Sequence, residues 1–565
     1  QMCIRDRGTA GLLSVEASNV LDVRDSVNFG AHAERSKALA NGIDRRAFDQ
    51  AHLVSQGDMR FLARSADKTQ TALTTQADLN LIAAQIYPAT GAVAEVTAGN
   101  TGGEFDPART LRIGRVRSTD PALPYSVFGS LSLNASTIEQ GGVLRAPMGS
   151  LSLGVDGGIT RATKVINLLP GSLTSVSAGG LVLPYGGTVD GVTWRYDGKQ
   201  VELLGVGGTR STGNAAVGVQ LAGGSLNVQR DAVLDLSGGG QLLGAAFVSG
   251  RGGSTDARYN PLVQIGADGR FSLPGLATNP IYAIVPGSQP WVAPSGGEAG
   301  ATQPLVGQQI NIGAGVPGLP QGTYTLLPST YALLPGAFRL EINGLAAPFA
   351  SGAMHSAAAM NNGSWSTEGL LSVAGTHIRD SLSSQLIVTP AEVLRRYSQY
   401  NETAYADFIR ADAARLGVPR AALEADAKTL RLRLVGGQKD LGFSFDGEGR
   451  FKPAQGGFGA TVAVLSSGDI EVVSDTATAS SAALMASVRA SDLNALGAAR
   501  LVVGGELTVV YGQGGNFVRS DLAAITASSV VVRQDATLAA PEVFLVSGRS
   551  SGAIEIEQGA SINTL

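Results

Sequence analysis

The chain has 565 residues, of which 75 are glycine, and only 16% are charged, whereas about a quarter is typical of globular proteins. With a formal net charge of −4 and no basic run, the sequence gives no electrostatic reason to expect nucleic acid or an anionic membrane as a partner. Hydrophobic residues make up 44% but aromatic residues only 5%, so we expect a core of many small layers of Ala, Val and Leu. No apolar run reaches the roughly 18 residues that a membrane helix needs.

The first seven residues, QMCIRDR, differ in character from everything that follows and contain the only cysteine, Cys3. We interpret residues 1–7 as a leader foreign to the native fold, and we expect any export signal to lie upstream. Apart from Cys3 the chain has no thiol, which excludes disulfides and thiolate metal sites. Such a composition suits export through an oxidising bacterial periplasm.

Short alternating segments recur along the chain. GSLSL occurs at 129–133 and again at 149–153, and GDMRFLA at 57–63 aligns with ADLNLIA at 77–83 at the same offset, matching Asp58 with Asp78. Alternation over four or five residues is typical of a strand with one buried face. A repeat unit of about 20 residues holds about three strands and their turns, with Gly and Asn at the corners in positive-φ conformations.

One unit cannot bury its own apolar face, but stacked units can. The sequence therefore predicts an all-β fold: a right-handed parallel β-helix (β-solenoid) with about 20 residues per coil and about 15 to 20 coils. An up-and-down barrel or a propeller is the alternative architecture. A propeller would need aromatic blade markers and a period about twice as long, which the sequence lacks.

In chain order we expect coils over 8–273, with a short helical excursion around 33–50, and a Pro/Gly-rich β module over 274–350. Coils or a linker then occupy 351–388, a helical insertion 389–436, and coils again 437–565. Thr389-Pro390-Ala391-Glu392 fits a capping box. The first predicted helix has an apolar stripe and ends at Gly417; a second begins at Pro419. These stripes are Tyr405, Phe408, Ile409 and Leu416, and then Leu423, Ala427, Leu430 and Leu434.

Two short sequences match a catalytic motif and a cofactor-binding motif, but neither is followed by the secondary structure that the motif requires. GRSSG at 548–552 fits a nucleophile elbow around Ser550, but a strand rather than a helix follows it, contrary to what that chemistry needs. GAGVPG at 313–318 fits a dinucleotide glycine pattern, yet Pro317 and LPQGTYTLLP cannot open the helix whose N-terminus would meet a pyrophosphate. We interpret both as Gly-rich turns.

Two pairs of residues are candidates for metal ligands or catalytic carboxylates. His32 and His52 have the same offset as the GSLSL repeat and would stack on adjacent coils, but no third ligand is evident. Asp231 and Asp235, spaced by four, would face the same side of one strand, but no partner at the repeat spacing reinforces them. The simpler interpretation is a stacked or exposed histidine pair and a solvated strand face.

Aromatic residues concentrate in the Pro-rich region, where Trp291, Tyr324, Tyr331 and Phe338 lie. Such a module could contact a glycan or a protein, but a small local core is the favoured interpretation. No RGD tripeptide occurs in the chain.

The string GSLSLNASTIEQGGVLRAPMGSLSL at 129–153 resembles the coils of filamentous haemagglutinin-type exoproteins, the large secreted members of two-partner secretion systems. ADLNLIAAQIYPATG at 77–91 and GLPQGTYTLLPSTYALLPGAFRLEI at 318–342 resemble a subgroup of that family. The resemblance implies export through an outer-membrane barrel transporter, display on the bacterial surface or release, and adhesion to cells, matrix or other bacteria.

We therefore expect an internal or C-terminal segment of a surface adhesin that is not an enzyme. No catalytic, cofactor-binding or metal-binding residue is predicted, and no nucleic-acid partner. Two alternatives remain: a polysaccharide-active β-helix enzyme, supported mainly by analogy of fold, and the stalk of a contact-dependent toxin.

Overall fold

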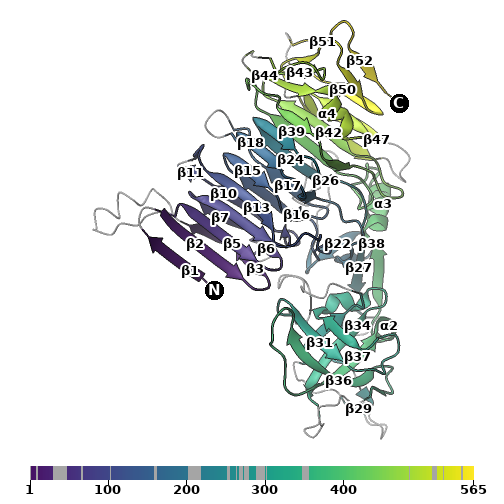
Figure 1. Ribbon diagram of the computed structural model, residues 1–565. Helices are drawn as coiled ribbons and strands as arrows, with labels where there is room; N and C mark the ends of the chain where they lie inside the picture. Colours follow the sequence, from purple (N-terminus) through teal and green to yellow (C-terminus); the bar gives the residue numbers. More distant parts are fainter. Residues whose placement is uncertain are drawn as a thin grey trace. The chain divides into compact units, whose positions relative to one another are not determined.

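The computed structural model describes residues 2–7, 10–29, 48–64, 68–101, 103–157, 162–200, 218–250, 255–262, 264–265, 271–272, 279–287, 300, 302–346, 356–480, 482, 484–511, 518–525, 527–548 and 552–564. The chain forms two compact units (Figure 1). The β-helix unit comprises Gln1–Gly180, Leu203–Gly240 and Ala413–Leu565, and the inserted unit comprises Leu181–Glu202 and Gln241–Asp412. Among the described residues, no helix is long and apolar enough to cross a membrane.

The β-helix unit is built of three long sheets, which the chain visits in the order A, B, C over most coils up to β41; beyond β41 the described strands of the long sheets belong to A and C. Sheet A contains, in spatial order, β1 (Met2–Arg7), β2 (Ala10–Ala17), β5 (Gln50–Ser55), β8 (Asp78–Ala83), β13 (Thr110–Arg115), β15 (Thr137–Gln140), β18 (Val165–Leu168), β25 (Ser225–Val228), β40 (Phe443–Phe445), β44 (Met485–Arg489), β43 (Asp469–Val473), β48 (Val530–Val532) and β51 (Ile554–Ile556). All of its pairings are parallel except that of β1 with β2. The prediction of a parallel β-helix is confirmed.

The other two long sheets have seven and ten strands in the part of the chain that the structure describes. Sheet B contains β3 (Leu21–Arg24), β6 (Met59–Leu62), β9 (Ile86–Pro88), β16 (Val143–Arg145), β19 (Leu173–Ser175), β26 (Val233–Asp235) and β41 (Glu448–Arg450). Sheet C contains β4 (Ser26–Phe29), β7 (Gln70–Thr75), β10 (Val93–Ala98), β14 (Ser130–Asn134), β17 (Ser150–Leu153), β24 (Gly218–Gly223), β39 (Thr429–Leu434), β42 (Thr461–Ser466), β45 (Arg500–Val503) and β50 (Glu542–Leu545).

The β-helix unit also contains smaller elements outside the three long sheets. They are the hairpin of β11 (Asn100–Thr101) and β12 (Glu104–Phe105), the hairpin of β46 (Gly505–Tyr511) and β47 (Val518–Ile525), the parallel pair β49 (Thr537–Ala539) and β52 (Ser561–Asn563), and α4 (Ala490–Ala495).

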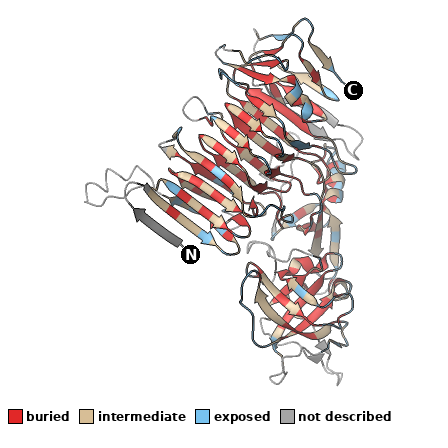
Figure 2. Cartoon of the chain, in the orientation of Figure 1, coloured by how far each residue is buried: buried red, intermediate tan, exposed pale blue. Residues whose placement is uncertain are grey.

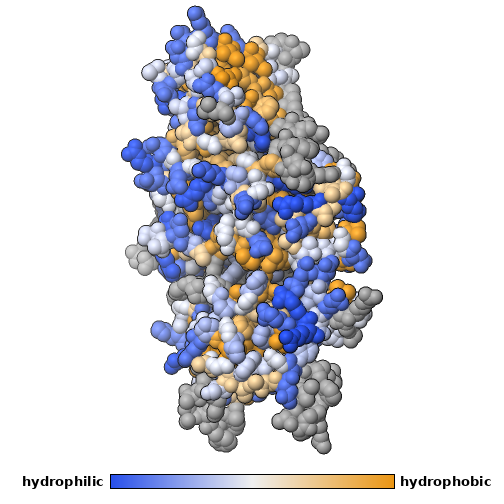
Figure 3. All heavy atoms as spheres, turned by 90° about the vertical axis from the view of Figure 1, so that its right-hand side faces the viewer, coloured by the Kyte–Doolittle hydropathy of each residue, from blue (hydrophilic) through white to orange (hydrophobic). Residues whose placement is uncertain are grey.

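Inward and outward residues alternate along the strands (Figure 2). Leu131 of β14 pairs with Leu151 of β17, which pairs with Val219 of β24, and all three are buried in one continuous apolar column. Stacking rungs of this kind remove apolar surface that no single coil could cover. At the far end of the column, Ile554 and Ile556 of β51 stay 48% and 50% exposed. Figure 3 shows apolar surface at the top of the view.

The register confirms one predicted repeat and overturns the other. Ser130 pairs with Ser150, as the GSLSL spacing predicts. Met59, however, pairs with Ile86, and Leu79 pairs with Ala51, so GDMRFLA lies in sheet B whereas ADLNLIA lies in sheet A. The two strings share an alternating pattern that suits any of the three sheets. For that reason their similarity does not show that they occupy the same position in successive coils.

The coils are longer and fewer than predicted. In sheet A, Thr137 pairs with Val165, and Val165 pairs with Ser225, so the chain between successive rungs exceeds the interval from Ser130 to Ser150. Sheet A has twelve strands besides β1 in the described residues, against the predicted 15 to 20 coils. Loops and the inserted unit account for the difference, because they lengthen the chain between rungs without adding to the stack.

The glycine that precedes each SLSL repeat has a different role from the one predicted. Positive φ is adopted by the residue before it, at Phe128 (59°) and Met148 (50°). A Cβ on Gly149 would overlap the backbone carbonyl oxygen of Gly129 on the preceding coil. Glycine is therefore required here for the close approach of successive coils rather than for the corner conformation.

The inserted unit contains an antiparallel sheet with its own apolar cluster. Its strands, in spatial order, are β32 (Gly322–Thr325), β31 (Gln308–Ile312), β36 (Trp365–Val373), β37 (Ser384–Pro390), β34 (Phe338–Leu345), β30 (Ile281–Ile284) and β33 (Leu327–Pro328), with β35 (Ala358–Ala359) beside β36. The β module predicted over 274–350 is longer than expected, because the sheet extends to Pro390. Residues 365–373 and 384–390, expected to be coil or linker, are two of its strands.

The remaining elements of the inserted unit are short. They are a sheet of β20 (Val182–Pro184), β27 (Gln241–Phe247) and β38 (Tyr400–Ala404), a sheet of β21 (Gly187–Val189), β22 (Thr193–Tyr196) and β23 (Lys199–Gln200), the pair β28 (Gln264–Ile265) and β29 (Phe271–Ser272), the 3₁₀ helix η2 (Ser329–Leu333), α2 (Ala391–Tyr397) and α3 (Tyr405–Leu416).

The helical region over 389–436 differs from its prediction in three respects. The first is that β38 interrupts the helix predicted to run from the capping box to Gly417, and so divides it into α2 and α3. Helix α2 begins after Pro390 without a side-chain cap, because the Thr389 hydroxyl bonds that of Ser364 at 2.8 Å instead. Helix α3 and its end at Gly417, with φ of 66°, agree with the prediction. The predicted second helix is absent: residues 429–434 form β39 of the β-helix. Their alternating TLRLRL pattern is typical of a strand. The prediction relied instead on the helical spacing of Leu423, Ala427, Leu430 and Leu434.

The first residues of the chain belong to a sheet. The backbone of Met2–Arg7 pairs antiparallel with β2, whereas the unusual composition of residues 1–7 set them apart from the predicted fold. Most of the predicted helical excursion at 33–50 lies outside the described residues, as do His32, Trp291 and Ser550.

Candidate functional site

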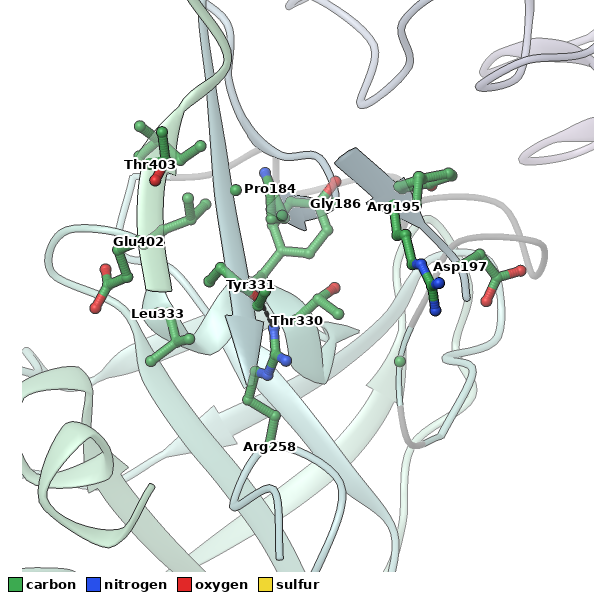
Figure 4. A pocket seen from close by; sticks show the side chains of 18 of the residues that line it. Pro184, Gly186, Arg195, Asp197, Arg258, Thr330, Tyr331, Leu333, Glu402 and Thr403 are labelled. Carbon is green, nitrogen blue, oxygen red and sulfur yellow. Dashed lines mark hydrogen bonds between the residues drawn. The ribbon is translucent and has the colours of Figure 1, made fainter. Parts of the chain in front are cut away.

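The inserted unit contains a cavity of about 500 Å³. Its walls are the β21–β22 hairpin with the following turn, strand β27, the end of strand β38 at residues 402–404, the segment around Arg258, and η2. Figure 4 shows Arg195 and Asp197 on one side and Glu402 and Thr403 on the other, with Thr330 and Tyr331 between them.

Two Asp-Gly turns shape the hairpin that carries Arg195. Asp190 and Gly191 have φ of 53° and 67°, and Asp197 and Gly198 have φ of 49° and 75°. Positive φ at both central residues is typical of β-turns of type I′, for which Asp-Gly is a preferred sequence. The strings VDGV and YDGK are therefore a local signal for this hairpin, although the hairpin was not among the predicted elements.

Trp194 anchors the hairpin to the rest of the unit. Its side chain is 1% exposed, and its ring lies 5.6 Å from that of Tyr405, at 90°, and 5.1 Å from that of Phe408. A Cβ on Gly244 would lie 2.5 Å from the Trp194 ring, so glycine makes room for the indole. Edge-to-face aromatic contacts of this kind add to the stability that burial provides, so Arg195, the next residue, projects from a fixed strand.

A buried ion pair forms one wall of the cavity. The Arg258 guanidinium donates to both carboxylate oxygens of Asp256, the shortest contact being 2.7 Å, and to the Ala245 carbonyl at 2.9 Å. The Tyr400 hydroxyl donates to Asp256 at 2.8 Å, and the guanidinium lies 5.2 Å from the Tyr259 ring and 4.8 Å from the Tyr400 ring.

These contacts fix the protonation states of that wall. Burial acts to lower the pKa of Arg258, but the hydrogen bonds to Asp256 and the neighbouring charges outweigh it and the pKa is raised. Burial raises the pKa of Tyr400, and the neighbouring Asp256 carboxylate raises it further. At neutral pH the guanidinium is charged and the phenol is protonated, so this cluster is rigid and electrically balanced.

The opposite wall is held by a second pair. Arg395 of α2 donates to both oxygens of Glu402, at 2.6 and 2.8 Å, and to the carbonyl of Leu333 at 2.7 Å. By contrast, Arg195 and Asp197 are exposed and form no ion pair with any residue that the structure describes. They are the charged groups of the cavity that remain available to a ligand.

The cavity thus combines tyrosine rings with charged and hydroxyl groups. Tyr196, Tyr259 and Tyr331 supply aromatic surface, and the guanidinium of Arg195 can donate two parallel hydrogen bonds to a ligand. A concave site with aromatic walls and a few convergent polar groups is the usual form of a small-ligand site.

The candidate residues from the sequence are mostly outside this cavity. Tyr331 is the exception: it is 2% exposed and lines the cavity, whereas Phe338 and Tyr324 pack in the local core of the antiparallel sheet, as the favoured interpretation held. Residues 313–318 form turns after β31, and no helix follows before β32. His52 lies on β5 between Ser14 and Asn80 of the neighbouring strands.

The candidate carboxylate pair is separated. Asp231 lies in an exposed turn with φ of 64°, and only Asp235 lies on β26, where it accepts hydrogen bonds from Ser175 and Ser237. The four-residue spacing predicted one strand face, but the strand begins only at Val233. Within the described residues, no group of three or more metal-ligating side chains is found. Comparison with protein families, with curated proteins and with solved structures finds no match.

Proposed function

We propose that the chain is a non-enzymatic segment of a secreted bacterial surface adhesin or fibre of filamentous haemagglutinin type, and that the inserted unit binds a surface glycan or protein. The observation that carries the proposal is a ligand-sized cavity in a unit that the β-helix does not need for its own register. Strands β24, β25 and β26 pair directly with β39, β40 and β41, so the ladders continue across the insertion.

The chemistry of the cavity supports a glycan as the ligand. A sugar ring has an apolar face that suits tyrosine and hydroxyls that pair with Arg and Asp side chains. Its volume of about 500 Å³ holds one or two sugar rings by comparison with typical ligand sites of about 300–1,000 Å³. The ion pairs of Arg258 and Arg395 supply walls that need no rearrangement on binding, which favours affinity.

Export and location are part of the same proposal. The sequence resemblance and the thiol-free repeats support passage through the periplasm and an outer-membrane barrel transporter, followed by display at the cell surface. A transporter gene beside the gene for this protein would support this route, and its absence there would count against it.

Ligand binding is tested with the whole chain. The fluorescently labelled protein is applied to a glycan array. Each glycan that binds is then added stepwise to the unlabelled protein while the tryptophan fluorescence of the protein is followed. All three tryptophans, at 194, 291 and 365, belong to the stretches of sequence that make up the inserted unit. Since Trp194 adjoins Arg195, binding in the cavity is expected to change its emission.

Matched variants assign the binding to the cavity. Arg195→Ala and Asp197→Asn are expected to weaken it by about tenfold or more, because each removes a charge-assisted hydrogen bond, and Asn keeps the positive-φ turn. Arg396→Ala, an exposed arginine on α2 outside the cavity, is expected to leave binding unchanged. The absence of glycan and cell binding, together with turnover of a polysaccharide, would overturn the proposal in favour of an enzyme.

A further inference from the structure

A ladder of polar side chains runs along the outer face of sheet B, on the β-helix unit. Its consecutive rungs are Asp22, Arg60, Tyr87, Arg145, Ser175, Asp235 and Arg450. The neighbouring residues on these strands, such as Phe61, Ile86 and Leu144, point into the apolar column. Because side chains on a strand alternate, the ladder must lie on the opposite face.

Two of the three arginines on this ladder have a carboxylate partner. Arg60 is paired with Asp22 at 2.8 Å, and Arg450 is paired with Glu448 at 2.7 Å. Arg145 has none: it is only 8% exposed, its Nε atom is enclosed without a hydrogen-bond partner, and no ion pair or hydrogen bond joins its guanidinium to any residue in the described part of the chain.

The carboxylates near Arg145 are already engaged elsewhere. Asp120 is paired with Arg115 at 2.7 Å, Asp235 accepts from Ser175 at 3.0 Å and from Ser237 at 2.6 Å, and Asp58 accepts from Gln85 at 3.2 Å. Burial lowers the pKa of Arg145, and these more distant carboxylates offset that only in part. A guanidinium remains charged at any physiological pH, so the site encloses a positive charge that no contact within the described chain neutralises.

We propose that Arg145 is the anchor of a second binding site, on the β-helix unit, which takes a single oxyanion group: a carboxylate or sulfate. A buried charge is costly unless a counter-charge and hydrogen bonds satisfy it, and the planar fork of a guanidinium matches the two oxygens of such a group. The small exposed fraction of Arg145 suits one pendant group, carried by an acidic polysaccharide or present as a free ion.

The first experiment measures binding of sulfate to the full chain by equilibrium dialysis with radiolabelled sulfate at constant ionic strength. Arg145→Met is expected to abolish the site, and Arg145→Lys to weaken it by about 10–100-fold, because an ammonium keeps the charge but loses the bidentate geometry. Arg112→Met is the matched control: Arg112 lies on the neighbouring sheet A, is 51% exposed and is paired with Glu139. Equal binding by all four proteins would overturn the proposal.

A second measurement locates the bound anion directly. Crystals of the chain grown with selenate are expected to show an anomalous peak within hydrogen-bond distance of the Arg145 guanidinium, and water alone at that position would overturn the proposal. In unfolding experiments, sulfate is expected to raise the melting temperature of the wild type more than that of Arg145→Met. The rise in Arg145→Met measures the general stabilisation that follows because sulfate is excluded from the protein surface. An identical rise in both proteins would also overturn it.

Competition distinguishes the two sources of the oxyanion. Displacement of labelled sulfate by an oligosaccharide of uronic acid at concentrations well below those of free acetate would assign the site to an acidic polysaccharide. Displacement by acetate and the oligosaccharide at equal concentrations of carboxylate would assign it to a free anion. Asp120→Asn is expected to tighten sulfate binding in either case, because it removes a competing negative charge.

Discussion

The guanidinium of Arg339 and the carboxylate of Glu341 lie 2.9 Å apart on β34, and neither side chain is exposed at all. Arg339 also donates to the carbonyl of Asn260 at 2.8 Å, and Asn279 donates to Glu341 at 2.8 Å. The pair therefore ties the antiparallel sheet to the segment that leads out of the Arg258 wall of the cavity. Burial lowers the pKa of Arg339, and the charge of Glu341 opposes that effect.

Glu341→Gln is expected to destabilise the inserted unit by about 3–5 kcal/mol, because it leaves the buried Arg339 without a counter-charge. Tryptophan fluorescence during urea unfolding reports on this unit, since all three tryptophans belong to it. The double variant Arg339→Met/Glu341→Leu removes both charges and is expected to be near the wild type or more stable. A single variant that loses less than about 1 kcal/mol would contradict the importance of this pair.

Leu131→Ala is expected to destabilise the β-helix unit by about 2–5 kcal/mol, because Leu131 is fully buried in a rung between Ala94 and Leu151 and its loss leaves a cavity. Far-UV circular dichroism during thermal or urea unfolding follows this unit, which holds most of the strands. Ser132→Ala, one residue away on the outward face of β14, is the control and is expected to change stability by less than about 0.5 kcal/mol. Equal effects of the two substitutions would mean that the register is wrong.

Gly149→Ala is expected to be far more damaging than Gly171→Ala. A Cβ at position 149 would overlap the Gly129 carbonyl oxygen, so the coils must separate, whereas Gly171 has φ of 77° with open space around it. The cost at position 171 is that of a left-handed conformation, about 1–2 kcal/mol, and Gly171→Asn is expected to recover part of it because Asn tolerates that conformation. Soluble yield and melting temperature provide the comparison, and equal losses at the two positions would contradict the close approach of the coils at Gly149.

The fold class could be predicted because its physical cause is local. Alternation over SLSL and over TLRLRL indicates which residues face the core. Short units can bury those faces only by stacking on one another. Sequence alone could not assign a strand to sheet A, B or C, because all three have the same period. That is why Met59 was matched with Leu79 although it pairs with Ile86.

The cavity and the Arg145 site could not be predicted for a different reason. The cavity joins Arg195, Arg258 and Tyr331, which lie far apart in the sequence and share no motif. Arg145 carries no signal in its own strand, since what sets it apart is that three nearby carboxylates are bound by other groups. Only the two Asp-Gly turns beside Arg195 gave a local signal, and they indicate a hairpin without indicating a ligand.

The stability of the β-helix unit is expected to depend on pH through Asp58, which is 4% exposed immediately before β6. Burial raises the pKa of Asp58 from 3.8 to about 6, although the hydrogen bond from Gln85 and the charge of Arg60 act in the opposite direction. Between these two pKa values the folded chain therefore holds a proton that the unfolded chain has released. Stability falls as pH rises wherever the folded state binds more protons.

Asp58→Asn tests this directly, because Asn can still accept the hydrogen bond from Gln85 but does not titrate. Urea midpoints from far-UV circular dichroism at pH 4, 5, 6, 7 and 8 give the comparison. The wild type is expected to lose stability relative to Asp58→Asn as pH rises from 4 through 6, with little further change in the difference between pH 7 and pH 8. Asp231→Asn, in an exposed positive-φ turn that Asn also tolerates, is expected to follow the wild type throughout. A constant difference between the wild type and Asp58→Asn across this range would mean that the carboxyl of Asp58 is ionised in the folded chain as readily as in the unfolded one.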